Sequence, residues 1–169
     1  MLILIVYASK YGAVKKAANI LSGELQKKNL SNTSINISDL SNNNIDLSKY
    51  ESIIIGGSIY FGKIQKSLIK FCKNNKDTLL NKTISFFVCS GNEKEIDNHF
   101  ENSFDSELLD HSLTKGYFGY EYNFEKMNCL YKFIVKKIAA INHSEYKIKI
   151  ENIKSFVNKL NKEMNGLNE

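Results

Sequence analysis

The N-terminal part of the chain passes from a strand pattern to a helix pattern across one short turn. From Leu2 the chain is an unbroken apolar run with several β-branched residues, which predicts a strand buried on both faces. The turn that follows contains Ser9 and Gly12. Apolar residues then recur at helical spacing, at Val14, Ala17, Ala18, Leu21 and Leu25. Backbone N–H groups at the start of that helix lack internal partners, so the turn is predicted to bind an anion such as phosphate.

Strand and helix patterns alternate along the rest of the chain. Strands are expected at 33–39, 52–55, 83–89 and 115–122, and helices at 64–72, 93–110 and 153–164. The Asn-rich stretch 41–49 is expected to be a loop or one poor helical turn. This alternation predicts an α/β fold with a five-stranded, parallel, doubly wound sheet in three α/β/α layers. With the strand order 2-1-3-4-5, the switch point at which ligands bind lies between the first and third strands.

Two further turns follow the predicted third and fourth strands. Gly57-Ser58-Ile59-Tyr60-Phe61-Gly62 comes after the third strand, and Ser90-Gly91-Asn92 comes after the fourth. The carboxyl ends of neighbouring parallel strands meet at one edge of a sheet. These two turns and the first one are therefore predicted to form a single site.

The length of the chain and its cysteines limit the classes of protein to which it can belong. At 169 residues the chain fits a single domain spanning 1–169, since no linker rich in Gly, Pro or Ser divides it. Cys72, Cys89 and Cys129 are expected to be buried thiols of a reducing cytoplasm. The apolar N-terminus is too short for a signal peptide, and no segment approaches a membrane span. We therefore expect a cytoplasmic protein, or one peripheral to the membrane from that side.

Several kinds of chemistry lack the residues that they need. The first turn matches neither G-x-G-x-x-G nor G-x-x-x-x-G-K-[ST], the dinucleotide and nucleoside triphosphate motifs. A phosphate-accepting receiver domain would need an Asp where Gly57-Ser58 stands. No Ser-His-Asp or Cys-His arrangement can be placed at one strand end. His99, His111 and His143 show no metal-ligand spacing and are expected at the surface.

The first turn resembles the flavodoxin signature. Ile5-Val6-Tyr7-Ala8-Ser9-Lys10-Tyr11-Gly12 and the later Ala18 match it, whereas Val14 stands where the family usually has Thr. The resemblance implies FMN bound non-covalently, with its phosphate on the turn made of Ser9, Lys10, Tyr11, Gly12, Ala13 and Val14. Replacing Val14 by Thr is then expected to tighten FMN binding through one more hydrogen bond to a charged group.

The same resemblance assigns roles to the other two turns. It implies that Tyr60 stacks on the isoalloxazine ring, with Phe61 as the second candidate. For Phe61, packing beneath the following helix is the preferred interpretation. Backbone groups of the rest of this turn would tune the ring, and they belong to Gly57, Ser58, Ile59 and Gly62. The backbone of Ser90, Gly91 and Asn92 would contact the pyrimidine side.

A basic, aromatic, amphipathic segment at about 123–142 is an insertion that short flavodoxins lack. Lys132, Lys136 and Lys137 are interleaved with its apolar stripe, and the whole chain carries a net charge of +5, whereas carrier flavodoxins are acidic. Together with 56–62 and 116–120, this segment resembles the menaquinone-dependent protoporphyrinogen dehydrogenase group of flavodoxin-like enzymes. The resemblance implies an FMN-dependent dehydrogenase of porphyrin biosynthesis that passes electrons to a quinone. The three lysines would then contact an anionic membrane.

Other interpretations stay open. Segment 123–142 fits an ordinary helix covering the sheet as well as one that lies on lipid. The chain also fits a flavodoxin that carries electrons between protein partners, or a degenerate flavodoxin-like domain that acts only in interactions. Basic charge alone fits nucleic acid as well as anionic lipid. The partner expected here is a quinone or a redox protein, and no nucleic acid.

Overall fold

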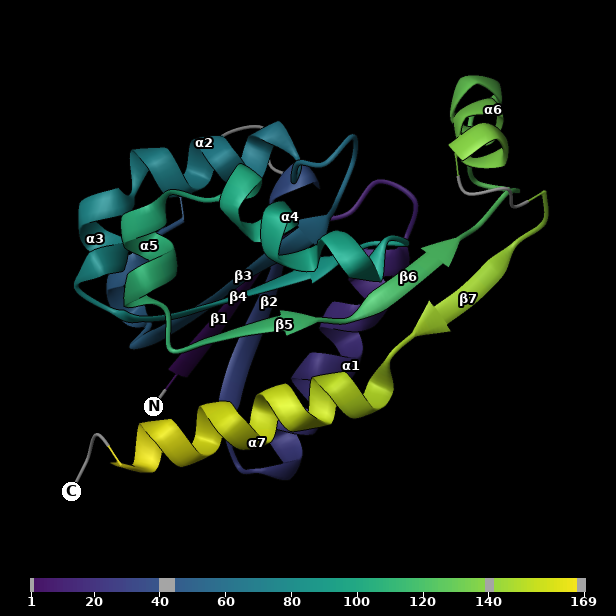
Figure 1. Ribbon diagram of the computed structural model, residues 1–169. Coiled ribbons are helices and arrows are strands. Elements are labelled where there is room, and N and C mark those ends of the chain that lie inside the picture. The colour runs from purple at the N-terminus through teal and green to yellow at the C-terminus, as the bar shows by residue number, and fades with distance from the viewer. Residues whose placement is uncertain (1, 40–44, 139–141, 167–169) are drawn as a thin grey trace.

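The computed structural model describes residues 2–39, 45–138 and 142–166. Its centre is a five-stranded parallel sheet in the order β2-β1-β3-β4-β5 (Figure 1). The strands are β1 (Leu2–Ala8), β2 (Ser31–Asn36), β3 (Ser52–Ser58), β4 (Thr83–Cys89) and β5 (Thr114–Tyr117). Ala8 lies beside Gly57, and Ser58 lies beside Cys89, so the three central strands end at one edge. The predicted fold class and strand order are confirmed.

Helices cover both faces of this sheet. On one face lie α1 (Ala13–Lys27) and α7 (Ile150–Gly166), which pack against each other (Figure 1). The other face is covered by α2 (Lys66–Asn74), α3 (Lys76–Leu80), α4 (Ile96–Ser103) and α5 (Ser106–His111). Short 3₁₀ turns complete the connections at η1 (Ile37–Asp39), η2 (Leu47–Lys49) and η3 (Glu93–Glu95).

Side chains that alternate along β1 separate two apolar cores. Leu4 and Val6 belong to the core under α2 to α5, whereas Ile3 and Ile5 belong to the core under α1 and α7. The predicted apolar stripe of α1, from Val14 to Leu25, is fully buried in the second core. Burying one such side chain contributes about 1.5–3 kcal/mol. Both cores therefore hold the end of β1, and the turn that follows it, in a fixed place.

The acidic segment 93–110, expected as one helix, is divided. It forms η3, α4 and α5, and the chain is extended at Phe104 (φ −126°, ψ 154°) and Asp105 (φ −62°, ψ 137°). The Asp105 carboxylate accepts a hydrogen bond from the backbone N–H of Glu107 at 3.0 Å, which caps α5. The ring of Phe104 turns into the core and packs 4.3 Å from that of Phe86. A new cap and a buried ring therefore override the continuous helical pattern.

The predicted fifth strand, 115–122, is also divided. Only β5 joins the main sheet, whereas β6 (Gly119–Tyr122) leaves it and pairs antiparallel with β7 (Glu145–Ile148). Gly119 takes φ +78°, and a Cβ there would lie 1.9 Å from the carbonyl oxygen of Lys147, so only glycine fits. Figure 1 shows the resulting arm, the described part of 119–148, with α6 (Cys129–Ile138) at its tip.

Smaller differences concern element ends and one cysteine. The second strand begins and ends earlier than 33–39 and lies at the predicted edge of the sheet, and the helix expected at 64–72 begins at Lys66. Cys72 and Cys89 are buried as expected, but Cys129 is exposed at the start of α6. Its exposure follows from the position of α6 on the arm, away from both cores.

Candidate functional site

The turn after β1 presents a row of unpaired backbone donors. Gly12 takes φ +104°, and the first internal hydrogen bond of α1 runs from the N–H of Lys16 to the carbonyl of Gly12 at 3.0 Å. Within the described residues, the backbone N–H groups of 10–14 have no acceptor. The partial positive charge at the start of a helix adds to these donors. The turn is therefore a cradle for an anion such as a phosphate.

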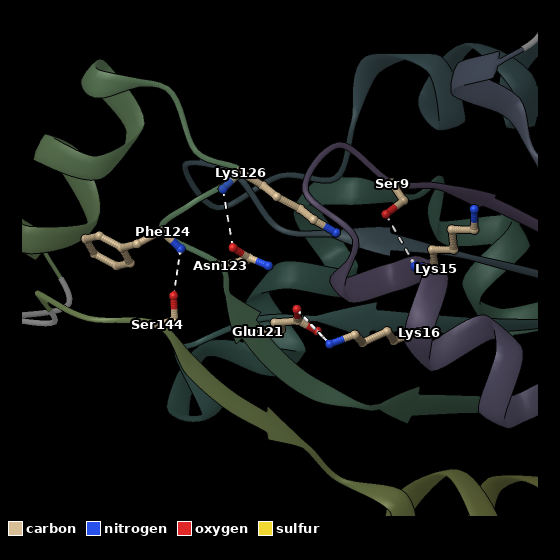
Figure 2. Close-up of polar contacts among 8 residues, drawn as sticks. All are labelled: Ser9, Lys15, Lys16, Glu121, Asn123, Phe124, Lys126 and Ser144. Atoms are coloured by element: carbon tan, nitrogen blue, oxygen red, sulfur yellow. Dashed lines mark hydrogen bonds and ion pairs between the residues drawn. The ribbon is translucent and has the colours of Figure 1, made fainter.

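Ser9 holds this turn from inside. Its hydroxyl oxygen accepts the N–H of Lys15 at 3.3 Å (Figure 2). Its own N–H donates to the side-chain oxygen of Asn36 at 3.2 Å. The hydroxyl proton stays available to a ligand. Val14 points its side chain into the core, where it is fully buried. Position 14 can therefore contribute its backbone N–H to the turn, while its side chain serves the packing of α1.

The second turn is a tight hairpin. Tyr60 and Lys63 exchange two backbone hydrogen bonds, of 2.8 and 3.2 Å, across Phe61 and Gly62, which both have positive φ. Two positive φ values are typical of a type I′ turn, whose central side chains point outward. Phe61 is accordingly 75% exposed, and the expectation that it packs beneath the following helix is wrong.

Hydrogen bonds and a close contact attach the second turn to the neighbouring strands. A Cβ on Gly57 would lie 2.3 Å from the side-chain oxygen of Gln65, so the absence of a side chain allows this close approach. The amide of Gln65 donates to the carbonyl of Ala8 at 3.0 Å, and the N–H of Ile59 donates to the carbonyl of Cys89 at 2.9 Å. The ends of β1, β3 and β4 are thus tied together around one space.

The third turn is closed by the arm. The N–H of Ser90 donates to the carbonyl of Gly119 at 2.9 Å, and the hydroxyl of Ser90 accepts the N–H of Asn92 at 3.1 Å. A Cβ on Gly91 would lie 2.1 Å from the hydroxyl oxygen of Tyr122, so this ring covers the glycine directly. The turn is therefore both a wall of the site and an anchor for β6.

The three turns meet at a cavity of about 240 Å³. Residues 58–62 and 90–92 line it, together with Tyr11 and Ala13. Ser9, Lys10 and Gly12 form the turn beside it, and Val14 and Gly57 are buried behind it. The site residues chosen from the sequence are thus brought together at one strand edge, and their contacts to FMN stay a prediction.

The arm contributes lining residues that the sequence reasoning did not assign to the site. The ring centre of Tyr131 in α6 lies 5.0 Å from the ring centre of Tyr11 and 5.2 Å from that of Tyr60. Burial raises the pKa of Tyr60 to about 12 and raises that of Tyr131 as well, so both phenols are neutral at physiological pH. Met127 and Val135 complete this cover. In the sequence, Tyr131 and Met127 stand out only as members of an apolar stripe. Such a stripe does not show which part of the protein it packs against.

His99, expected at the surface, lies in the cavity wall. It is 6% exposed, and its Nδ1 atom is buried without a hydrogen-bond partner in the described part of the chain. Burial lowers the pKa of this imidazole, so it is neutral at physiological pH. A lone histidine in a polar segment carries no sequence signal of such a position.

One ion pair joins the arm to the first turn's helix. Glu121 of β6 is 5% exposed, and both its carboxylate oxygens lie 3.0 Å from the ammonium of Lys16 (Figure 2). The same ammonium lies 4.7 Å from the centre of the Tyr146 ring. A carboxylate held out of water needs such a partner. The cavity wall on this side is therefore close to neutral.

The model of the family described as flavodoxin domain matches residues 4–149. The chain belongs to this family. No curated protein matches it. Family membership indicates FMN as the cofactor. The site fits this group, because in the described residues the unpaired backbone N–H groups of the first turn, which can bind a phosphate, lie beside a cavity lined by tyrosines.

Solved structures share the fold. Flavodoxin 1 from Bacillus cereus is 15% identical, with 96% of this chain and 98% of that chain covered and a TM-score of 0.61. The flavodoxin of Streptococcus pneumoniae TIGR4 is also 15% identical, with 96% and 99% covered and a TM-score of 0.57. Rubredoxin oxygen:oxidoreductase from Desulfovibrio gigas is 12% identical, with a TM-score of 0.66, and 98% of this chain spans 36% of that protein.

Two features of the described residues concern metal ions and membranes. No group of three or more His, Cys, Asp or Glu side chains there is arranged to hold a metal ion. In the same residues, none of the helices combines the length and the apolar character that crossing a membrane requires.

Proposed function

We propose that this chain is an FMN-dependent dehydrogenase that oxidises a reduced porphyrin-like or other apolar substrate and delivers the electrons to a quinone. The observation that carries the proposal is the cover over the cavity. Tyr131 and Met127 from the arm close over Tyr11 and Tyr60, so the pocket is walled mainly by aromatic and apolar groups. Such walls favour an apolar group beside the flavin over a charged one.

The overall reaction balances without another reactant. The substrate loses two electrons and two protons, and the quinone gains two of each to become a quinol. FMN, when bound, supplies the two-electron redox chemistry. The protein would bind and orient the ring system in a cavity whose wall includes Tyr60 and Tyr131 with neutral hydroxyl groups.

The exposed side chains of α6 support the proposal that the electron acceptor is a quinone dissolved in a membrane. Leu130 is 69% exposed and Phe133 is 62% exposed, which places two large apolar groups on one side of the helix. Lys136 and Lys137 are exposed nearby, with the Lys137 ammonium 5.8 Å from the centre of the Phe133 ring, and Lys132 is half-buried. Each lysine near an anionic surface contributes about 1 kcal/mol. This face therefore fits loose, reversible contact with anionic lipid.

The test uses the FMN-loaded protein with vesicles of phosphatidylglycerol and of phosphatidylcholine. We expect binding to the anionic vesicles only, lost at high salt, and faster reoxidation of the reduced protein by a menaquinone analogue in those vesicles. Replacing Lys132, Lys136 and Lys137 by Gln should reduce both and leave FMN bound. Replacing three exposed lysines of α2, Lys66, Lys70 and Lys73, removes the same charge and should change neither.

An electron carrier between proteins is the second candidate, favoured by the match to flavodoxins over almost their whole length. If vesicle binding is undetectable at low salt and quinones do not reoxidise the protein, the carrier hypothesis replaces ours. A preparation that is colourless and does not quench FMN fluorescence would instead favour a domain that acts only in interactions.

A further inference from the structure

Hydrogen bonds within the arm shape the turn between β6 and α6, which lies beside the first turn. Asn123 is buried, and its side-chain oxygen accepts the N–H groups of Glu125 and Lys126 at 3.2 and 3.3 Å. The N–H of Phe124 donates to the hydroxyl of Ser144 at 3.0 Å (Figure 2). The backbone at Lys126 is therefore fixed by both neighbouring segments of the arm, although its side chain is exposed.

From this turn the side chain of Lys126 reaches back to the start of α1. A Cβ built on Gly12 would lie 3.8 Å from the ammonium nitrogen, which Figure 2 shows beside the loop that leads into α1. That loop holds the five backbone N–H groups without an acceptor. The ammonium group of Lys126 therefore lies next to the unpaired backbone N–H groups of the first turn.

The other lysines near this loop are placed differently. Lys16 is committed to Glu121. Lys10 directs its ammonium toward the ring of Tyr11, 5.2 Å from its centre. Lys15 lies on the other side of the loop from Lys126 (Figure 2). In the described part of the chain, the ammonium of Lys126 has no carboxylate within 4.0 Å, so its charge is available to a ligand.

We propose that Lys126 binds the phosphate of FMN, so that the arm is part of the cofactor site and selects FMN over riboflavin. The inference rests on the flavin part of the proposed function and not on the quinone. Backbone N–H groups orient a phosphate, and an ammonium neutralises its charge. Val14 offers no hydroxyl to this phosphate, and Lys126 supplies an ionic contact from a distant segment instead.

The experiment compares the affinities of the apoprotein for FMN and riboflavin by flavin fluorescence quenching. Lys126→Gln should weaken FMN binding about tenfold and leave riboflavin binding unchanged, because riboflavin lacks the phosphate. Lys126→Arg should retain most of the FMN affinity. Lys70→Gln, an exposed lysine on the other face of the sheet, is the matched control and should bind both flavins like the parent. Circular dichroism and thermal unfolding confirm that each variant folds.

Three results would overturn this inference. Unchanged FMN affinity in Lys126→Gln would show that the ammonium does not contact the phosphate. Equal weakening of FMN and riboflavin would mean that Lys126 shapes the cavity. A parent protein that binds neither flavin would overturn the flavin assignment and Lys126 with it. Selective weakening of FMN in a protein that quinones do not reoxidise would uphold Lys126 and refute only the dehydrogenase.

Discussion

The unit formed by β1 and α1 and the arm formed by the described part of 119–148 face the same cavity, but they are held in different ways. The first unit is buried in the two cores along nearly its whole length. The arm pairs mainly with itself, through β6 and β7, and touches the body through links such as Glu121 to Lys16 and Ser90 to Gly119. Rigid packing thus positions the first turn, while a lightly attached element covers the cavity.

This difference has a functional meaning. A phosphate site gains from donors that are already in place, because little ordering remains when the ligand binds. A cover over a ring-binding pocket must let the cofactor in, and an element with few buried apolar contacts opens at a small free-energy cost. The following tests measure the contrast directly, beginning with the largest expected effect.

Thiol labelling should separate the two regions most strongly. At pH 8 in native conditions, Cys129 on the arm is expected to react with a thiol reagent about a hundredfold or more faster than Cys72 and Cys89, since these must wait for opening of a core. Burial also raises the pKa of both core thiols to about 12. Mass spectrometry of the labelled peptides identifies the sites. Comparable rates at all three would show that the cores are not closed.

Because of these high thiol pKa values, the free energy of unfolding should fall at alkaline pH. The folded-state pKa values lie above the ordinary value of 9.0, so the unfolded chain loses these protons first as pH rises. The contribution is complete below about pH 9 and is lost as pH rises toward about 12. A melting temperature that falls over this range, and falls less in Cys72→Ala, is the expected result.

Two leucines test the same contrast by stability. Leu21 is fully buried in α1, and Leu21→Ala should lower the free energy of unfolding by about 2–5 kcal/mol. Leu130 is exposed on α6, and Leu130→Ala should change it by less than about 0.5 kcal/mol. Urea unfolding gives both values. A large loss in Leu130→Ala would mean that the outer face of α6 is covered by a partner, such as a second copy of the chain.

Val14→Thr tests which part of residue 14, its backbone or its side chain, serves the first turn. The sequence resemblance led us to expect tighter FMN binding, but the side chain at this position is buried in the core. We now expect the free energy of unfolding to fall by about 1–3 kcal/mol, because a hydroxyl enters an apolar site, with the FMN affinity unchanged. Tighter FMN binding would show instead that the side chain at position 14 reaches the phosphate.

Much of the body could be predicted because its signals are local. The apolar run from Leu2, the small turn at Gly12 and the stripe from Val14 to Leu25 depend on neighbours a few residues apart. The same holds for β4, found at 83–89 as expected. Strands that alternate with helices allow few topologies, and these bring the ends of β1, β3 and β4 to one edge. The sequence by itself therefore determined the sheet, its order and the three turns of the site.

Tertiary structure alone decided what closes the site. Whether 115–122 stays in the sheet depended on Gly119 and on the approach of Lys147. The position of Tyr131 over Tyr60, of His99 in the cavity wall and of the Lys126 ammonium beside Gly12 depends on the direction in which the arm and α4 leave the sheet. Such contacts join residues far apart in the chain. Their formation depends on the sum of many small packing and hydrogen-bonding energies, and no periodic pattern in the sequence records that sum.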